Sequence, residues 1–329
     1  MTNPLSIFDL DSNSSLAFAT ASALGAPLSA WEERQFEDGE HKARPLESVR
    51  GHHVVLLQSL YSDAAHSVND RLVRELFFVA ALKDAGATEV TVVAPYLAYA
   101  RKDRRSKPRD PVTHRYVAQL FEAVGSDRLL TIDVHNLAAY QNAFRIPTEH
   151  LEAKSLFVDH FATLLEGNAC ILSPDVGGVK RAEALRRSLS RRLGRELNSA
   201  FMQKWRSRGE LSGERLVGDV AGQEVVIIDD LIASGATLLR TIEAAERAGA
   251  RRIHAAATHA LWAGKSHALL DHPALTTLVV TDTLPLLQHA NPVLQQRVEL
   301  LSVAPLLAEA IGRIHRRESL TELWLDAEA

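Results

Sequence analysis

Seven short apolar runs, separated by longer stretches with a helical pattern, constrain the fold of this chain more than any other feature. Each run is rich in Val, Ile or Leu without strict alternation, as expected for strands that are covered on both faces. The predicted strands are Val54–Leu57, Val90–Ala94, Leu129–Ile132, Ala169–Leu172, Val225–Ile228, Ile253–Thr258 and Leu278–Thr281. The predicted helices are Asp70–Ala85, Val112–Val124, Ser155–Leu165, Val179–Leu193, Thr237–Ala248 and a terminal Val303–Leu325. Strands that alternate with helices predict an α/β fold with mainly parallel sheets flanked by helices.

The two halves of the chain also resemble each other. The block Gly51-His-His-Val-Val-Leu-Leu-Gln-Ser-Leu60 aligns with Gly222-Gln-Glu-Val-Val-Ile-Ile-Asp-Asp-Leu231. Further along, Ala85-Gly-Ala-Thr-Glu-Val90 aligns with Ala248-Gly-Ala-Arg-Arg-Ile253, and the match continues to Tyr99-Ala100 against Trp262-Ala263. Chance is the alternative, but two aligned blocks in one order favour a degenerate internal repeat. The repeat predicts two similar domains, residues 1–150 and 151–329.

Composition excludes several classes of protein. A chain of 329 residues with 46% hydrophobic and 24% charged residues has the make-up of a globular protein, not of a disordered or fibrous one. No apolar run approaches the ~18 residues of a membrane-spanning helix, and a net charge of −4 argues against a nucleic-acid partner. The amino terminus lacks a secretory-signal pattern, and the single cysteine, Cys170, lies in an apolar run as a buried thiol would. We therefore expect a cytoplasmic protein with no membrane or nucleic-acid partner.

The segment Val225-Val-Ile-Ile-Asp-Asp-Leu-Ile-Ala-Ser-Gly-Ala-Thr-Leu238 carries the clearest chemical signal. An apolar strand ends in two carboxylates, and a short loop then leads into a helix. Backbone N–H groups at a helix N-terminus attract phosphate, and the hydroxyls of Ser234 and Thr237 add donors. Asp229 and Asp230 suit sugar hydroxyls, because a carboxylate accepts several hydrogen bonds. The segment therefore indicates a ribose 5-phosphate site; an ordinary strand end and N-cap is the alternative.

This segment resembles the ribose-phosphate-binding motif of the phosphoribosyltransferase superfamily. Five other segments narrow the resemblance, in this order along the chain: Phe36-Glu-Asp-Gly-Glu40, Tyr99-Ala-Arg-Lys-Asp-Arg-Arg105, Thr131-Ile-Asp-Val-His135, Ser173-Pro-Asp-Val-Gly-Gly178 and Gly218-Asp-Val-Ala-Gly222. Together they resemble the ribose-phosphate pyrophosphokinase family, also called phosphoribosyl pyrophosphate synthetases, over nearly the whole chain.

The resemblance implies a reaction and an architecture. The β,γ-diphosphoryl group of ATP would pass to the anomeric hydroxyl of ribose 5-phosphate, giving phosphoribosyl pyrophosphate and AMP, with Mg²⁺ as cofactor. It implies two duplicated phosphoribosyltransferase-type domains. The first would have a degenerate site and supply ATP-binding segments, and the second would hold the ribose 5-phosphate site and the terminal helix. It also implies a homo-oligomer built from dimers, with a hexamer as one option.

Individual roles follow from the same resemblance. Ribose 5-phosphate would be held by Asp229, Asp230, Ser234, Gly235, Ala236 and Thr237. ATP would be held by Phe36, Asp38 and Glu40 of a flap that reaches across a subunit interface, and by Arg101, Lys102 and Asp103. His135 and Asp175 would be metal ligands, and Gly177 and Gly178 would form a diphosphate loop whose successive N–H groups face the anion. Chemistry alone would not select His135, because Mg²⁺ prefers oxygen.

The segment 201–213 is expected to be a long basic loop that acts as a lid. Its Lys204 and Arg206 match the outer members of the family's Lys-Arg-Arg set, which makes them the catalytic candidates. Phosphoryl transfer depends on positioned positive charge more than on a covalent catalyst. A solvated charged loop is the alternative.

Two other functions stay open on the sequence. A phosphoribosyltransferase that consumes phosphoribosyl pyrophosphate shares the Asp229–Thr237 loop. A catalytically silent regulatory homologue is suggested by three departures from the family pattern: Lys102 for glutamine, Trp205 for arginine and Ala233 for aspartate. Release of AMP from ATP and ribose 5-phosphate distinguishes these functions from the synthetase.

Overall fold

The computed structural model describes residues 3–11, 14–207, 210–263, 266–286 and 297–325. It divides into two compact units, Met1–Glu152 with Ser302–Leu323, and Ala153–Leu301 with the last six residues. The first division falls two residues beyond the predicted 150/151 boundary. The terminal helix was expected in the second domain, but residues Ser302–Leu323 belong to the first unit.

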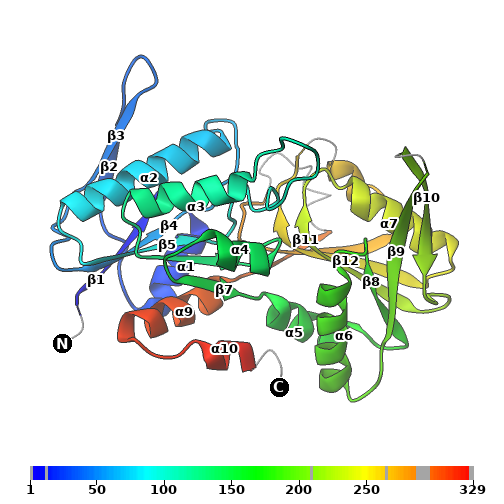
Figure 1. Cartoon of the computed structure of the whole chain (residues 1–329). Helices are drawn as coiled ribbons and strands as arrows, with labels where there is room; N and C mark the ends of the chain where they lie inside the picture. Colours follow the sequence, from blue (N-terminus) through cyan, green and yellow to red (C-terminus); the bar gives the residue numbers. More distant parts are fainter. Residues whose placement is uncertain (1–2, 12–13, 208–209, 264–265, 287–296, 326–329) are drawn as a thin grey trace. The chain divides into compact units, whose positions relative to one another are not determined.

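The first unit is built on a five-stranded parallel sheet with the order β1-β4-β5-β6-β7 (Figure 1). Its strands are β1 (Leu5–Asp9), β4 (His53–Leu57), β5 (Glu89–Ala94), β6 (Arg128–Ile132) and β7 (Thr148–Leu151). Its helices are α1 (Ser15–Leu24), α2 (Val68–Asp84), α3 (Thr113–Ala123), α4 (Leu137–Ala143) and α9 (Ala304–Arg316), followed by α10 (Thr321–Leu325). A separate antiparallel hairpin, β2 (Trp31–Gln35) with β3 (His41–Pro45), projects from this unit.

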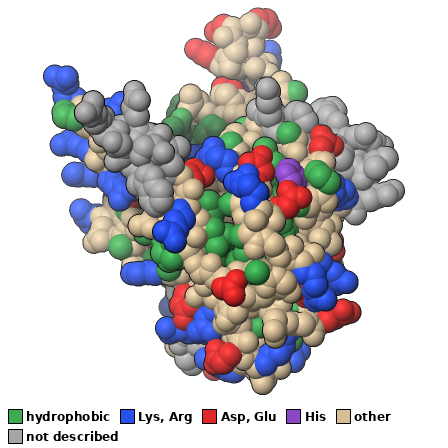
Figure 2. All heavy atoms as spheres, turned by 90° about the vertical axis from the view of Figure 1, so that its right-hand side faces the viewer, with side chains coloured by type: hydrophobic (Ala, Val, Ile, Leu, Met, Phe, Trp, Pro, Cys, Tyr) green, Lys and Arg blue, Asp and Glu red, His purple; other side chains and the backbone are tan. Residues whose placement is uncertain are grey.

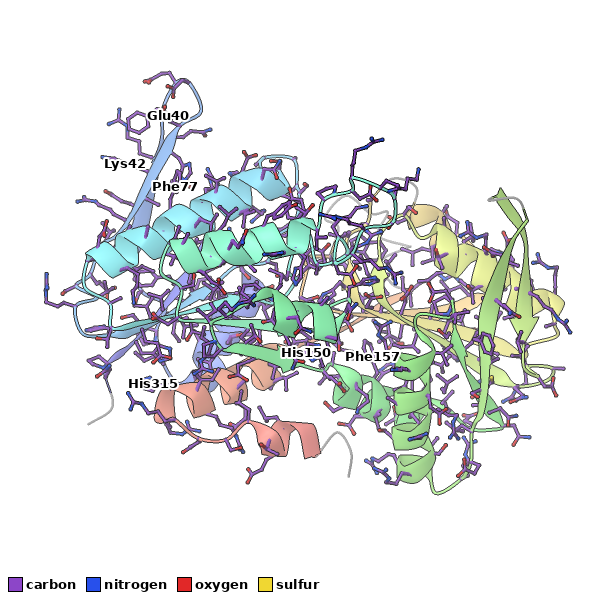
Figure 3. All side chains as sticks on the ribbon, in the orientation of Figure 1. Glu40, Lys42, Phe77, His150, Phe157 and His315 are labelled. Carbon is purple, nitrogen blue, oxygen red and sulfur yellow. The ribbon has the colours of Figure 1, made fainter. Side chains whose placement is uncertain are left out.

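Alternate residues of the first sheet meet different helices. Val54 and Leu56 of β4 belong to the core that includes Leu76 and Val79 of α2, whereas α1 and α9 cover the other face. On that second face the Nδ1 atoms of His53 on β4 and His315 on α9 lie 3.1 Å apart with their rings stacked; Figure 3 shows His315 in the last turn of α9. The terminal helix is thereby joined to the first sheet.

The terminal segment also differs from the single predicted helix. The helix α9 ends at Arg316, because Arg317 adopts the left-handed conformation with φ 61°. A second short helix, α10, starts after Ser319, whose Oγ accepts a hydrogen bond from the Thr321 N–H. The break turns one predicted helix into two.

The second unit contains a seven-stranded sheet with the order β10-β9-β8-β11-β12-β13-β14, parallel except for β10. Its strands are β8 (Ala169–Ser173), β9 (Asn198–Ser207), β10 (Glu210–Val217), β11 (Glu224–Ile232), β12 (Arg252–Ala260), β13 (Leu275–Thr281) and β14 (Val298–Leu301). Its helices are α5 (Lys154–Leu164), α6 (Val179–Leu193) and α7 (Ala236–Arg247), with the 3₁₀ turn η1 (Ser266–Leu269). Cys170 is fully buried on β8 as predicted, and burial raises the pKa of its thiol to about 12.

Matching backbone features confirm the predicted duplication. The order β1-β4-β5-β6-β7 of the first sheet corresponds to β8-β11-β12-β13-β14 of the second. The Gly51 N–H donates to the Gly86 carbonyl at 2.9 Å, and the aligned Gly222 N–H donates to the Gly249 carbonyl at 2.8 Å. Even the aligned pair Tyr99 and Trp262 share a positive φ, of 62° and 52°. The fold class predicted from the sequence, a duplicated α/β protein with mainly parallel sheets, is therefore confirmed.

Candidate functional site

A short loop with a left-handed glycine leads from β11 into α7. Gly235 is the N-cap of α7 with φ 74°, a left-handed conformation that favours glycine. The Leu239 N–H makes the first hydrogen bond of the helix, to the Gly235 carbonyl at 2.9 Å. Among the described residues no side chain caps this helix, and an anion is favoured at the first N–H groups of such a helix.

The backbone that follows β12 holds this loop from behind. The Leu261 N–H donates to the Ile232 carbonyl at 2.8 Å, and the Ala263 N–H donates to the Ala233 carbonyl at 3.0 Å. These bonds satisfy loop carbonyls through backbone groups alone, so an alanine at position 233 leaves them intact. The loop is therefore fixed by the sheet before any ligand binds.

The acid pair at the end of β11 is poorly solvated. The side chains of Asp229 and Asp230 are 19% and 9% exposed. Burial, and after it the neighbouring Asp230 carboxyl, raise the pKa of Asp229 to about 8 against the opposing effect of Arg181. The pair can therefore accept sugar hydroxyls in a region shielded from water.

The loop before α6 forms a compact hydrogen-bonded turn. The Ser173 hydroxyl donates to the Asp175 carbonyl at 2.7 Å, and the Gly178 N–H donates to the Asp175 carboxylate at 2.9 Å. A Cβ at Gly178 would lie 2.7 Å from the Ser173 hydroxyl oxygen, so only glycine fits there. Like α7, α6 begins without a side-chain cap. Gly177 and Gly178 thus belong to a compact turn at a helix N-terminus.

The structure brings two of the predicted nucleotide-binding segments together in the first unit. The Asn136 side-chain amide, next to His135, donates to the Asp103 carboxylate at 2.6 Å. The Lys102 carbonyl accepts a hydrogen bond from the His114 N–H at 3.2 Å, and Arg101 and Lys102 are exposed. The segments around Asp103 and His135 therefore share one edge of the first sheet.

The predicted flap is the turn of the β2–β3 hairpin. The Phe36 N–H donates to the Glu40 carbonyl at 2.7 Å, and the Glu40 N–H donates to the Asp38 carboxylate at 3.1 Å. The Arg34 guanidinium carbon lies 5.0 Å from the centre of the Phe36 ring. Figure 3 shows Glu40 at the tip of the hairpin. Phe36, Asp38 and Glu40 are thus gathered on a projecting turn, as a flap requires.

The prediction of a basic loop is wrong for most of segment 201–213, which forms strands. This segment belongs to β9 and β10, an antiparallel pair that extends the second sheet, with Glu214 opposite Lys204 in the register. The side chains of Lys204 and Arg206 lie outside the described residues, so only their backbone positions on β9 are given. Strand pairing, unlike a free loop, fixes which residues share a face.

In the described part of the first unit, side chains close the position equivalent to the start of α7. The helix α2 begins with a capping box, in which Ser67 and Asp70 satisfy each other's backbone N–H groups. Beside it, the buried Arg71 forms ion pairs with Asp11 and Asp63. A helix N-terminus closed by its own side chains, with an arginine bound by two carboxylates, offers no site for a sugar phosphate.

No cluster of three His, Cys, Asp or Glu side chains that could hold a metal ion occurs in the described part of the chain. The individual donors still differ in their suitability. Asp175 presents a half-buried carboxylate next to the diphosphate loop, and a carboxylate is the kind of oxygen ligand that Mg²⁺ prefers.

No helix among the described residues is long and apolar enough to span a membrane.

Arg181 is the residue that the sequence did not reveal. It lies in the first turn of α6, and its Nη1 is 3.5 Å from an Asp229 carboxylate oxygen and 3.4 Å from an Asp230 carboxylate oxygen. Arginine-rich helices usually expose their charges to solvent, and the sequence of α6 gives no sign of an exception. The only usable signal is its position three residues after the diphosphate loop. Figure 2 shows Lys and Arg side chains spread over this face of the molecule, with several along its left-hand margin.

Comparisons with known proteins agree with this geometry. A model of the N-terminal domain of ribose phosphate pyrophosphokinase matches residues 5–125, and a model of the phosphoribosyl synthetase-associated domain matches residues 205–325. Ribose-phosphate pyrophosphokinase 1 of Streptococcus pyogenes is 38% identical over 325 residues, which cover 97% of both chains. The corresponding enzyme of Streptococcus agalactiae is 37% identical over the same span. The crystal structure of phosphoribosylpyrophosphate synthetase from Mycobacterium smegmatis matches with a TM-score of 0.84 and 31% identity, over 95% of this chain and 99% of that one.

Proposed function

Because the chain belongs to the ribose-phosphate pyrophosphokinase family, we propose that it transfers the β,γ-diphosphoryl group of ATP to ribose 5-phosphate. The products are phosphoribosyl pyrophosphate and AMP. The observation that carries this function is the identity to named pyrophosphokinases over 97% of the chain. The uncapped start of α7 after the acid pair supports it in chemical terms.

Ribose 5-phosphate binds at the carboxyl end of β11. Its phosphate meets the N–H groups at the start of α7 and the hydroxyls of Ser234 and Thr237, with Gly235 and Ala236 leaving room for it. Its ring hydroxyls donate to Asp229 and Asp230. With both ends of the sugar held, the anomeric hydroxyl is the group left to react.

ATP binds through segments of the first unit. Phe36 stacks on the base, Asp38 and Glu40 accept hydrogen bonds from it, and Arg101, Lys102 and Asp103 contact the nucleotide. Lysine at position 102 supplies a point charge where an amide would read the base edge. The first unit contributes no second sugar site, since Arg71 and the capping box close the equivalent position.

Lys204 and Arg206 are the catalytic residues in this proposal. They neutralise the charge that develops on the transferring diphosphoryl group, while Gly177 and Gly178 bind its oxygens through backbone N–H groups. Asp175 and His135 would hold Mg²⁺, which would supply further charge neutralisation at the phosphates. The anomeric oxygen forms a bond to the β-phosphorus of ATP, the bond from that phosphorus to the α,β-bridging oxygen breaks, and AMP leaves with that oxygen. The proton of the anomeric hydroxyl passes to solvent.

The flap supports an oligomeric enzyme. Its exposed acidic turn projects from the first unit (Figure 1), where it can serve the nucleotide site of a neighbouring subunit. A homo-oligomer built from dimers is therefore part of the proposal. So is a cytoplasmic location, because phosphorylated substrates do not cross a bilayer unaided.

The decisive experiment measures AMP release from ATP and ribose 5-phosphate with and without Mg²⁺. Synthesis of phosphoribosyl pyrophosphate that requires both substrates supports the proposal. Consumption of phosphoribosyl pyrophosphate with a nucleobase, and no AMP release, would instead indicate a phosphoribosyltransferase. No turnover with either substrate set would indicate a regulatory homologue.

A further inference from the structure

The side chain of Arg181 links two loops that the chain places far apart. It starts from α6, three residues after Gly178 of the diphosphate loop, and reaches the acid pair at the end of β11. One nitrogen, Nη1, lies 3.5 Å from Asp229 and 3.4 Å from Asp230. At 28%, the Arg181 side chain is more exposed to solvent than the side chain of either aspartate.

The contact between Arg181 and the two aspartates affects the ionisation of those aspartates. Asp229 and Asp230 are adjacent, buried and of like charge, so desolvation and mutual repulsion oppose the ionisation of both. Even with the opposing charge of Arg181, these effects leave the pKa of Asp229 raised to about 8. Among the described residues, Arg181 on α6 is a cation that contacts the pair and lowers that pKa, and Asp230 on the same strand is an acid that raises it.

A protonated Asp229 would serve a sugar less well than a carboxylate. The protonated acid loses part of its capacity to accept hydrogen bonds from ring hydroxyls. Charge-assisted hydrogen bonds are also about twice as strong as neutral ones. Sugar binding near neutral pH therefore depends on a nearby positive charge.

We propose that Arg181 is a positioning residue for the synthetase reaction, which favours the ionised form of the Asp229–Asp230 pair and holds the two carboxylates toward the ribose hydroxyls. The same side chain ties the sugar-binding end of β11 to the helix that begins at the diphosphate loop. Arg181 touches neither substrate in this role; it acts through the two carboxylates. The inference rests on the proposed function, because it concerns binding of ribose 5-phosphate at that site.

The test compares three variants with the unmodified enzyme. R181Q removes the charge and keeps a side chain of similar reach, and R181K keeps a charge without the planar fork. K180Q is the matched control, because Lys180 is an exposed neighbour on the same helix turn. For each protein, kcat and KM for ribose 5-phosphate and for ATP are measured from about pH 6 to about pH 10.

The expected result is specific to one substrate and to pH. R181Q raises KM for ribose 5-phosphate by about tenfold near pH 7, and leaves KM for ATP within about twofold. The acid limb of its kcat/KM profile for ribose 5-phosphate moves to higher pH, so the defect shrinks as pH rises. R181K lies between R181Q and the unmodified enzyme, and K180Q matches the unmodified enzyme.

Other outcomes overturn the inference without ambiguity. An R181Q enzyme with an unshifted profile and unchanged KM for ribose 5-phosphate contradicts it, and so does an equal defect at all pH values. If R181Q does not fold, R181M takes its place, because it also removes the charge, and an unshifted R181M profile decides against the inference. Failure of the proposed function is distinguishable, because the unmodified enzyme itself would then release no AMP.

Discussion

Replacing Gly235 with alanine tests whether the left-handed turn before α7 sets the affinity for the sugar phosphate. Gly235 has φ 74°, and a Cβ there would lie 3.2 Å from Cα of Ser266. A left-handed alanine costs about 1–2 kcal/mol, and 1.4 kcal/mol corresponds to about a tenfold change in an equilibrium constant. If the turn relaxes, the first N–H groups of α7 turn away from the phosphate, and binding must restore the strained form. We therefore expect G235A to raise KM for ribose 5-phosphate by about 5- to 30-fold.

Gly222 provides the matched control. It has φ 68°, nothing described lies within 4 Å of an added Cβ, and it precedes β11, away from the loop. G222A should lose a similar amount of stability, seen as a lower midpoint of thermal unfolding, while KM for ribose 5-phosphate stays unchanged. Equal KM values for G235A and G222A in the AMP-release assay would refute the reasoning.

Three further predictions concern other parts of the chain. K204A should lower kcat by on the order of 10²- to 10³-fold, while ATP binding, measured by calorimetry, is retained. R215A removes another cation of the same hairpin and should leave kcat unchanged. Equal kcat values for K204A and the unmodified enzyme would remove Lys204 from the mechanism. The pKa of His53 is lowered chiefly by burial, as is that of His315. Their neutral forms are therefore favoured in the folded state, and stability present above about pH 6.5 should be lost as pH falls through the lowered values. The thermal midpoint of H53N should fall less between about pH 7.5 and pH 5.5 than that of the unmodified enzyme; identical slopes would contradict this. S67A, which breaks the capping box of α2, should cost about 1 kcal/mol in urea unfolding without changing either KM.

Much of the fold follows from local pattern. Strands such as Val225–Ile228 are continuous apolar runs, so their burial on both faces is visible in the sequence. The strands β1 and β7 were missed because they are short and mix polar residues with apolar ones. The sequence predicts a loop where the β9–β10 pair lies, because its basic residues do not show the apolar pattern of a strand. The two strands pair with each other, and β9 also pairs with β8.

The site was predictable where function resides in contiguous residues. The geometry of the loop from Asp229 to Thr237 can be predicted from its sequence, because an acid pair, a glycine and a helix start follow one another there. Arg181 was not predictable, because it meets Asp229 across 48 positions of sequence. The position of α9 was not predictable either, because the sequence of residues 304–316 does not indicate which of the two similar sheets the helix covers.

The placement of α9 has a consequence for how the protein is made. The first unit needs residues from both ends of the chain, because Leu307 and Ile311 are fully buried in a helix that packs on α1. During translation, the amino-terminal sheet therefore leaves the ribosome well before the helix that completes it. One face of this sheet stays uncovered until residues 304–316 have been made. A nascent chain halted before residue 302 should thus be a client for chaperones.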